Sequence, residues 1–332
     1  MISRNIDIEK AAERISKNII STELIESQQI NEKFGIRVFV KPECKQKTGS
    51  FKYRGAYNFI SKLYDKYNNK LNVVCFSSGN HGQAVAAVAK KFNIKATVIV
   101  PDTAPDYKIL NIRKYDPAII IHKGSRESME KRAHDLAKSN GSILVKPFDN
   151  EEIIAGQGTI GAEICKDMEK KNLKPDAILV PCSGGGLAAG IALGVKKVYP
   201  NTIIHPVEPE YYDDTRKSLI KGKIISNSMK YHSICDALLV PKPGLITFEI
   251  NKILLDQGFV VSDKEVIEAM KIGLNNFKLI LEPGGAVGLA VLLKKQLNRF
   301  YKNIVIIASG GNISIENHQQ LLKYRKESNK DE

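Results

Sequence analysis

Short apolar runs alternate with longer segments of helical periodicity along most of this chain, and this rhythm limits the possible folds more than any other feature. Apolar runs occupy 72–76, 95–100, 118–122 and 142–147, and the segments between them repeat apolar residues at helical spacing. Strands that alternate with helices in this way predict parallel pairing through crossover helices. We therefore expect a parallel sheet covered by helices in the first half of the chain.

The same rhythm returns in the second half. Strands are predicted at 177–181, at 202–209 and at the apolar start of 303–312. Helices are predicted at 156–171, in 182–198 after its glycines, at 263–277 and at 284–297. Ser262 or Asp263 is expected to cap the helix 263–277, with Glu265 in its first turn. The pattern predicts an α/β protein with two open parallel-sheet lobes, in which ligands bind outside the carboxyl ends of the strands.

A glycine-rich loop lies between the predicted strand 177–181 and the helix after it. The loop reads Ser183-Gly184-Gly185-Gly186. Glycines let backbone N–H groups converge on an anion, and the helix N-terminus adds partial positive charge. The loop therefore predicts a phosphate cradle, with a flexible turn as the plainer alternative. It is neither a P-loop nor a dinucleotide fingerprint.

Two further strand ends carry polar side chains. The segment after 72–76 contains Ser77, Ser78, Asn80 and His81, whose hydroxyls and free amide can hold a carboxylate or a phenolate oxygen. A capping turn alone would need only one such group. His81 by itself is equally well explained as a packing histidine. Ser309 follows the strand that opens 303–312 and precedes two glycines.

One lysine stands apart from the other basic residues. Lys52 lies in the stretch TGSFKYRGA (48–56), which is poor in solvating neighbours. With the three loops, in this order, the stretch resembles fold-type II enzymes that depend on pyridoxal phosphate, and among them the threonine/serine dehydratases and serine racemases. The resemblance runs from about Ile19 to Asn312. It implies a fold like that of the tryptophan synthase β-subunit, with a large cofactor-binding domain of 1–62 and 150–332 and a small domain of 63–149.

The resemblance also implies a role for each motif residue. Lys52 would be the Schiff-base lysine and the base for the α-proton, with Phe51 packed near the pyridine ring. Asn80 would bind the 3′-oxygen of the cofactor, and Ser309 would meet the ring nitrogen. The phosphate would be held by Ser183, Gly184, Gly185, Gly186 and Leu187. The substrate carboxylate would be surrounded by Ser77, Ser78, Asn80 and His81.

The residue types agree with that chemistry. A lysine must be neutral to attack a carbonyl, and a buried, partly apolar setting lowers its pKa toward that state. A hydroxyl at the ring nitrogen cannot hold it protonated as a carboxylate would, so the ring is a weaker electron sink. Loss of a β-hydroxyl as the α-proton leaves avoids a long-lived carbanion. The expected activity is a catabolic L-threonine/L-serine dehydratase that releases a 2-keto acid and ammonia.

The segment VEPEYYDD (207–214) matches the family's cation site. Glu208, Asp214 and the backbone carbonyl of Tyr212 would bind a divalent cation, since such oxygen ligands suit Mg²⁺, Ca²⁺ or Mn²⁺. The alternative is a cluster of acids at the entry of a helix. The resemblance also places Glu282 near the cofactor, without a defined role.

Other activities stay open. Ser78 stands where serine racemases carry their second base, so racemisation is an alternative, as is dehydration of threo-3-hydroxyaspartate. Asp236 is followed by Ala237 where racemases usually have glycine. Only about 20 residues follow the last motif, too few for a regulatory domain, which favours an enzyme without feedback control. A non-catalytic basic binding protein on the same scaffold is the alternative from another class.

Composition limits the partners and the compartment that we expect for the protein. The net charge is +14 from 50 Lys plus Arg and 36 Asp plus Glu, but the basic residues are spread along the chain without interleaved aromatics, which favours a solvated surface over a nucleic-acid partner. Five scattered cysteines indicate a reducing compartment. The sequence shows neither a secretory signal nor a run of about 20 apolar residues. We expect a cytoplasmic homodimer whose partner is a small hydroxy amino acid, with no membrane association.

Overall fold

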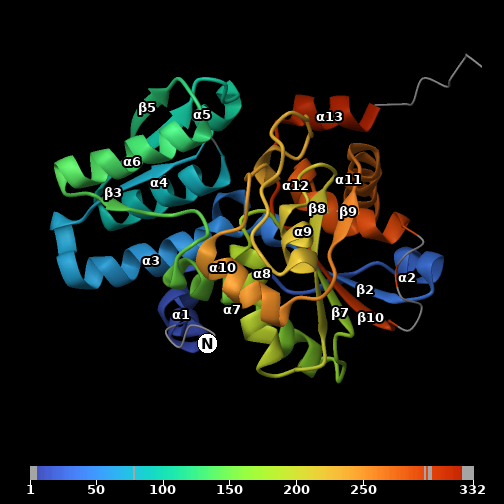
Figure 1. The fold of residues 1–332 in the computed structure, drawn as a ribbon. Coiled ribbons are helices and arrows are strands. Elements are labelled where there is room, and N and C mark those ends of the chain that lie inside the picture. Colours follow the sequence, from blue (N-terminus) through green and yellow to red (C-terminus); the bar gives the residue numbers. More distant parts are fainter. Residues whose placement is uncertain (1–5, 78, 295–296, 298–300, 324–332) are drawn as a thin grey trace, which may run out of the picture.

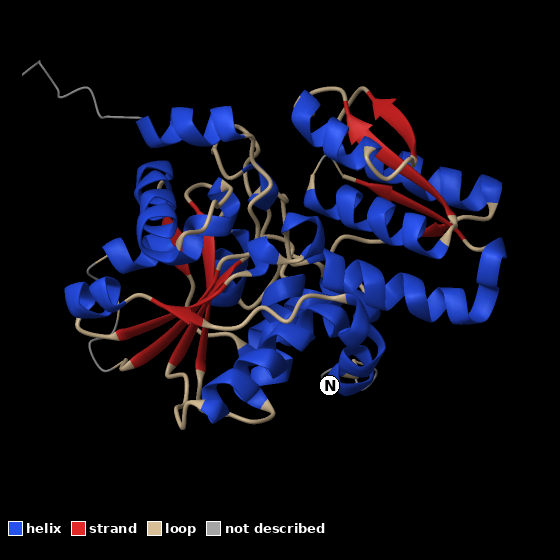
Figure 2. Cartoon of the chain, turned by 180° about the vertical axis from the view of Figure 1, so that it is seen from behind, coloured by secondary structure: helices blue, strands red, loops and turns tan. Residues whose placement is uncertain are grey.

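Two sheets in two lobes make up the protein, whose computed structural model describes residues 6–77, 79–294, 297 and 301–323 (Figures 1 and 2). The larger sheet has the order β1-β2-β10-β7-β8-β9 and the smaller one β5-β4-β3-β6. The larger sheet is formed by β1 (Ile25–Glu26), β2 (Arg37–Lys41), β7 (Ala177–Pro181), β8 (Ile203–Pro209), β9 (Phe259–Val261) and β10 (Asn303–Ile307). The smaller sheet is formed by β3 (Asn72–Phe76), β4 (Lys95–Pro101), β5 (Ala118–His122) and β6 (Ile143–Leu144).

Helices surround both sheets, as the view from behind shows (Figure 2). Those of the first half are α1 (Ile8–Ile15), α2 (Gln28–Phe34), α3 (Lys52–Tyr67), α4 (Asn80–Phe92), α5 (Asp106–Arg113) and α6 (Arg126–Asn140). Those of the second half are α7 (Glu151–Lys170), α8 (Gly186–Lys196), α9 (Asp214–Lys221), α10 (Leu245–Leu254), α11 (Asp263–Phe277), α12 (Pro283–Ala290) and α13 (Ile315–Lys323). α3 packs against both α7 of the larger lobe and α4 of the smaller lobe and so links the two lobes.

The strand pairing is parallel except at one edge, where β1 pairs with β2 in the antiparallel sense. In the centre of the larger sheet, Val305 of β10 lies opposite Phe39 of β2 and Ile178 of β7. All three side chains are fully buried, as expected for strands covered on both faces. The predicted α/β fold with two parallel-sheet lobes is confirmed.

Several predicted elements have the expected bounds. β3, β5 and β7 coincide with the predicted strands, and α11 covers 263–277. Ser262 is its N-cap, in a reciprocal capping box with Glu265. The strands of the smaller sheet all fall within 63–149, and those of the larger sheet fall outside it. The domain boundaries themselves stay a prediction.

Two predicted elements are shorter than expected. The strand 142–147 is reduced to Ile143–Leu144: Val145 still donates to the carbonyl of Val74, but Pro147 has no N–H with which to continue the pairing. The helix 284–297 ends as α12 at Ala290, where the hydrogen bonds tighten into a short 3₁₀ turn up to Leu293. Residues 295–296 and 298–300 lie outside the described part of the chain, as does the predicted tail from 324 onward.

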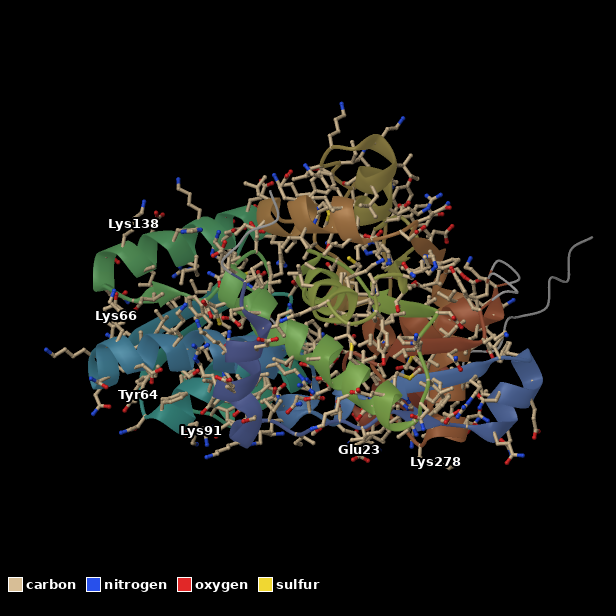
Figure 3. All side chains as sticks on the ribbon, turned by 90° about the horizontal axis from the view of Figure 1, so that it is seen from below. Glu23, Tyr64, Lys66, Lys91, Lys138 and Lys278 are labelled. Atoms are coloured by element: carbon tan, nitrogen blue, oxygen red, sulfur yellow. The ribbon has the colours of Figure 1, made fainter. Side chains whose placement is uncertain are left out.

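Positive charge is distributed over the surface of the smaller lobe. Lys66, Lys91 and Lys138 project from three different helices, α3, α4 and α6 (Figure 3). Within the described residues, no helix has both the length and the apolar character that a membrane span requires.

Candidate active site

A cavity of about 350 Å³ lies at the carboxyl ends of β3, β7 and β10 and is lined by residues of both lobes. It brings together the lysine and the three predicted loops, which are far apart in sequence. The predicted residues that line it are Phe51, Lys52, Ser77, Asn80, His81, Ser183, Gly184, Gly185, Gly186, Leu187, Glu282 and Ser309. Ser78 lies outside the described residues. The position agrees with the rule that ligands bind at strand carboxyl ends.

Lys52 is the first residue of α3, and its Nζ donates a hydrogen bond to the carbonyl oxygen of Pro147 at 2.7 Å. Burial lowers the pKa of Lys52 to about 7, and the positive charge of Arg126 acts in the same direction. The positive end of α3 also disfavours an ammonium there. A large share of the amine is therefore neutral at neutral pH, which is the state that a nucleophile or a base requires.

Backbone pairing places this lysine beside the third loop. The N–H of Phe51 donates to the carbonyl of Ser309 at 3.1 Å, and Ser50 forms an antiparallel bridge with Gly310. Ser309 itself is buried at the end of β10. A reactive amine and a hydroxyl thus face the same cavity from adjacent segments.

The glycine loop turns its carbonyl groups away from the cavity. Thr247 Oγ1 donates to the carbonyl of Gly184 at 2.7 Å, and Asn251 Nδ2 donates to that of Gly185 at 3.3 Å. In a trans peptide the next N–H points the opposite way, so the amides of Gly185 and Gly186 face the cavity at the N-terminus of α8. This is the arrangement of an anion site.

Side chains are excluded at these glycines. Gly185 has φ +90°, which favours glycine, and a Cβ there would meet the Asn251 side chain. A Cβ at Gly184 would strike the ring of Phe148. The loop is therefore closely packed without side chains of its own at Gly184 and Gly185, and its convergent amides fit the phosphate of a cofactor.

One ring nitrogen of His81 is held as a hydrogen-bond donor. Its Nε2 lies 2.8 Å from the carbonyl of Val145, an acceptor, so the proton resides on Nε2. Burial lowers the pKa of His81 to about 3, and the charge of Lys52 adds to this effect. A neutral, buried His81 supports the packing interpretation more than a role as an acid.

Three charged residues that line the cavity, Arg126, Lys108 and Asp236, were not predicted as site residues from the sequence. Arg126, at the start of α6, lies over the ring of Phe76, with 5.7 Å from its guanidinium carbon to the ring centre. Among the described residues no carboxylate lies within ion-pair distance of it. Lys108 of α5 pairs with Asp236 from the other lobe. Arg126 follows the end of β5, so the strand-end rule contained a signal for it.

The predicted cation ligands lie apart from this cavity. Glu208, at the end of β8, accepts hydrogen bonds from the backbone N–H groups of Thr215 and Arg216 at 2.9 and 2.8 Å. It therefore caps α9, which agrees with the helix-entry alternative. Asp214 is also buried, and its Oδ2 has no partner within the described residues. Two buried acids with an orphaned oxygen fit a hard cation. No group of three or more acidic, histidine or cysteine side chains suited to a metal occurs in the described ranges.

The two-lobed α/β fold, the Lys52 amine with its pKa of about 7 and the convergent glycine amides suit a phosphorylated carbonyl compound. The chain matches the family described as "Pyridoxal-phosphate dependent enzyme" over residues 15–310, and it belongs to that family. Its relatives include enzymes of its fold-type II branch.

Three relatives show the range of activities in that branch. The L-threo-3-hydroxyaspartate ammonia-lyase of Saccharomyces cerevisiae is 34% identical over 97% of this chain and 97% of its own length. The serine racemase of Dictyostelium discoideum is 38% identical over 95% and 97%. The solved structure of a threonine deaminase from T.th. is 34% identical, with a TM-score of 0.87 over 92% of this chain and 97% of that one.

Proposed function

We propose that this protein is an ammonia-lyase that removes the β-hydroxyl group of a 3-hydroxy amino acid and releases a 2-keto acid and ammonia. The observation that carries the proposal is the Lys52 amine, which burial brings to a pKa of about 7 beside an anion cradle. When bound, pyridoxal phosphate would supply the electron sink for bond breaking at the α-carbon. Lys52 would anchor it and move the α-proton, and Gly185 and Gly186 would hold its phosphate.

The unpaired Arg126 favours a substrate with an acidic side chain. A guanidinium in a cavity with no carboxylate at ion-pair distance among the described residues offers a bidentate site to a second carboxylate. Among the three substrates considered from the sequence, only 3-hydroxyaspartate has one. We therefore propose 3-hydroxyaspartate ahead of L-threonine and L-serine, which the sequence alone had favoured.

A substrate panel tests both parts of the proposal. Purified protein with pyridoxal phosphate is incubated with L-threo-3-hydroxyaspartate, L-threonine and L-serine, while keto acid and ammonia are measured. We expect ammonia from at least one of them, and none with Lys52→Ala. Loss of one charge-assisted contact in Arg126→Met should lower kcat/KM for hydroxyaspartate about tenfold to a hundredfold relative to serine. Arg132→Met, on the exposed face of α6, is the matched control.

A racemase is the rival function, because serine racemases are among the relatives. Chiral analysis of the same incubations separates the two. Formation of D-serine faster than that of pyruvate and ammonia would favour an isomerase over the lyase.

We also propose a divalent cation at Glu208, Asp214 and the carbonyl of Tyr212. The support is the burial of two acids and the orphaned Asp214 Oδ2. Mg²⁺, Ca²⁺ or Mn²⁺ should raise the melting temperature, since a ligand of the folded state stabilises it. Asp214→Asn should abolish the shift, whereas Asp213→Asn, which affects ion pairs with Arg216 and Lys217, should keep it. A melting temperature that no cation changes would contradict the site.

A further inference from the structure

A hydrogen-bonded chain made of the side chains of Asn312, Asn80 and Glu282 links the loop before Lys52 to the start of α12. Asn312 Nδ2 donates to the carbonyl of Thr48 at 2.7 Å and to Asn80 Oδ1 at 2.6 Å. Asn80 Nδ2 in turn donates to Glu282 Oε1 at 2.6 Å. Asn80 begins α4 in the smaller lobe, whereas Glu282 and Asn312 belong to the larger one. The chain therefore crosses between the lobes at the edge of the cavity.

The direction of every hydrogen bond in this chain is determined by its two ends. The Thr48 carbonyl can only accept, so the atom of Asn312 that faces it must be the NH₂ nitrogen. That nitrogen also faces Asn80, which must present its oxygen. At the other end the Glu282 carboxylate accepts, so Asn80 must present its nitrogen there. Both ends demand the same orientation of the Asn80 amide.

The backbone around the chain is shaped to admit these side chains. A Cβ at Gly310 would overlap Glu282 Oε1, and a Cβ at Gly49 would overlap Asn312 Oδ1. Gly49 also has φ +73°, which favours glycine. Glycines of two separate segments thus leave room for Glu282 and Asn312 to reach Asn80.

Glu282 can accept the hydrogen bond from Asn80 in either of its protonation states. Glu282 is buried, and burial raises its pKa to about 7. Lys108 acts against this rise, whereas Asp236 adds to it. Even a protonated Glu282 retains a carbonyl oxygen that can accept from Asn80.

We propose that Glu282 is a positioning residue which, with Asn312, holds the Asn80 amide so that it offers the cavity a donor and never an acceptor. The Asn80 nitrogen has two hydrogens, and one of them is donated to Glu282. The second is left for the ligand, and a donor suits a negatively charged ring oxygen. The proposal rests on the proposed place of Asn80 at the cofactor ring, and it gives Glu282 the role that the sequence left undefined.

Cofactor binding and its spectrum test the proposal apart from turnover. Apo-protein is titrated with pyridoxal phosphate, and the dissociation constant and the visible absorption band of the bound cofactor are recorded. Glu282→Ala should weaken binding about tenfold to a hundredfold, the value of one hydrogen bond to a charged group, and should shift the band. Glu282→Gln, whose Oε1 can accept the same bond, should restore both properties.

Further variants guard against a simple folding defect. Glu282→Asp keeps the charge but is one methylene too short, so it should behave like Glu282→Ala in a folded protein. Asn312→Asp puts an acceptor opposite Asn80 Oδ1 and should weaken binding as well. The control Glu265→Ala removes a carboxylate that caps α11 and should leave the constant and the band unchanged.

The outcomes separate this inference from the proposed function. Suppose that Lys52→Ala no longer binds the cofactor covalently, whereas Glu282→Asp keeps the wild-type dissociation constant and absorption band. The inference is then wrong while the proposed function stands. If Asn80→Ala also binds as the wild type does, Asn80 is not at the ring and the inference is equally overturned.

Discussion

At the residue scale, the pKa of Lys52 predicts how the protein captures its cofactor. If Lys52 is the lysine that anchors pyridoxal phosphate, as proposed above, its neutral amine would attack the aldehyde of the cofactor, with a C=N bond formed and water released. Since the pKa of Lys52 is about 7, the capture rate of apo-protein should rise with pH up to about 7 and then level off. An exposed lysine would keep gaining neutral amine up to about pH 10.4.

Stopped-flow absorbance after mixing apo-protein with pyridoxal phosphate at several pH values measures this rate. Lys52→Ala, treated in the same way and then with borohydride, should retain no covalent cofactor. A rate that still climbs between pH 8 and about 10 would show that burial does not lower the pKa of this amine.

Residue identities could be predicted from the sequence only where a local motif carried them. Lys52, Asn80 and Gly184 each lie in a short recognisable stretch, and all three line the cavity. Arg126 and Lys108 lie in helices that follow β5 and β4, so the strand-end rule indicates their region of the smaller lobe. It does not indicate which side chains of those helices line the cavity, because that depends on tertiary packing.

At the element scale, a buried ion cluster holds α3, the helix that begins with Lys52. Arg54 is fully buried and donates two hydrogen bonds to Glu43, each of 2.8 Å, and two to Glu163 of α7, at 2.7 and 2.9 Å. Glu43→Ala should leave that guanidinium partly unpaired and lower the free energy of unfolding by about 3–5 kcal/mol, as for other broken buried pairs.

Urea unfolding of the two proteins measures this difference. Glu9→Ala is the control, because Glu9 pairs with Lys197 on the surface and water screens that pair. An unfolding free energy of Glu43→Ala equal to that of Glu9→Ala would mean that the cluster does not anchor α3.

Elements with strong periodicity were predictable, and those shaped by contacts were not. β3, β5, β7 and α11 have the expected bounds because apolar runs and a capping box mark their ends. α10 was not predicted, although its Thr247 and Asn251 hold the carbonyl groups of the glycine loop. Its function in the fold lies in two side-chain contacts that the sequence pattern does not distinguish from those of any other helix.

At the scale of the whole molecule, one ion pair connects the two lobes across the cavity. Lys108 lies on α5 of the smaller lobe, and its side chain is 7% exposed. Its partner Asp236 lies in the larger lobe with a side chain that is 45% exposed. Both residues line the cavity, so the pair favours the arrangement in which the two lobes meet at the cavity.

Loss of this pair should therefore reduce the fraction of closed molecules. Because Asp236 is half exposed, the pair is worth about 1 kcal/mol at most, which corresponds to a rise in KM of about fivefold for Lys108→Met. High salt should raise the KM of the wild type by a larger factor than that of the variant, since both proteins bind a charged substrate but only the wild type has the pair. Lys114→Met, directly after α5, should behave as the wild type. Steady-state kinetics at low and high salt decide the matter. A KM of Lys108→Met that equals the wild-type value, or a salt dependence as steep as that of the wild type, would show that lobe closure does not depend on this pair.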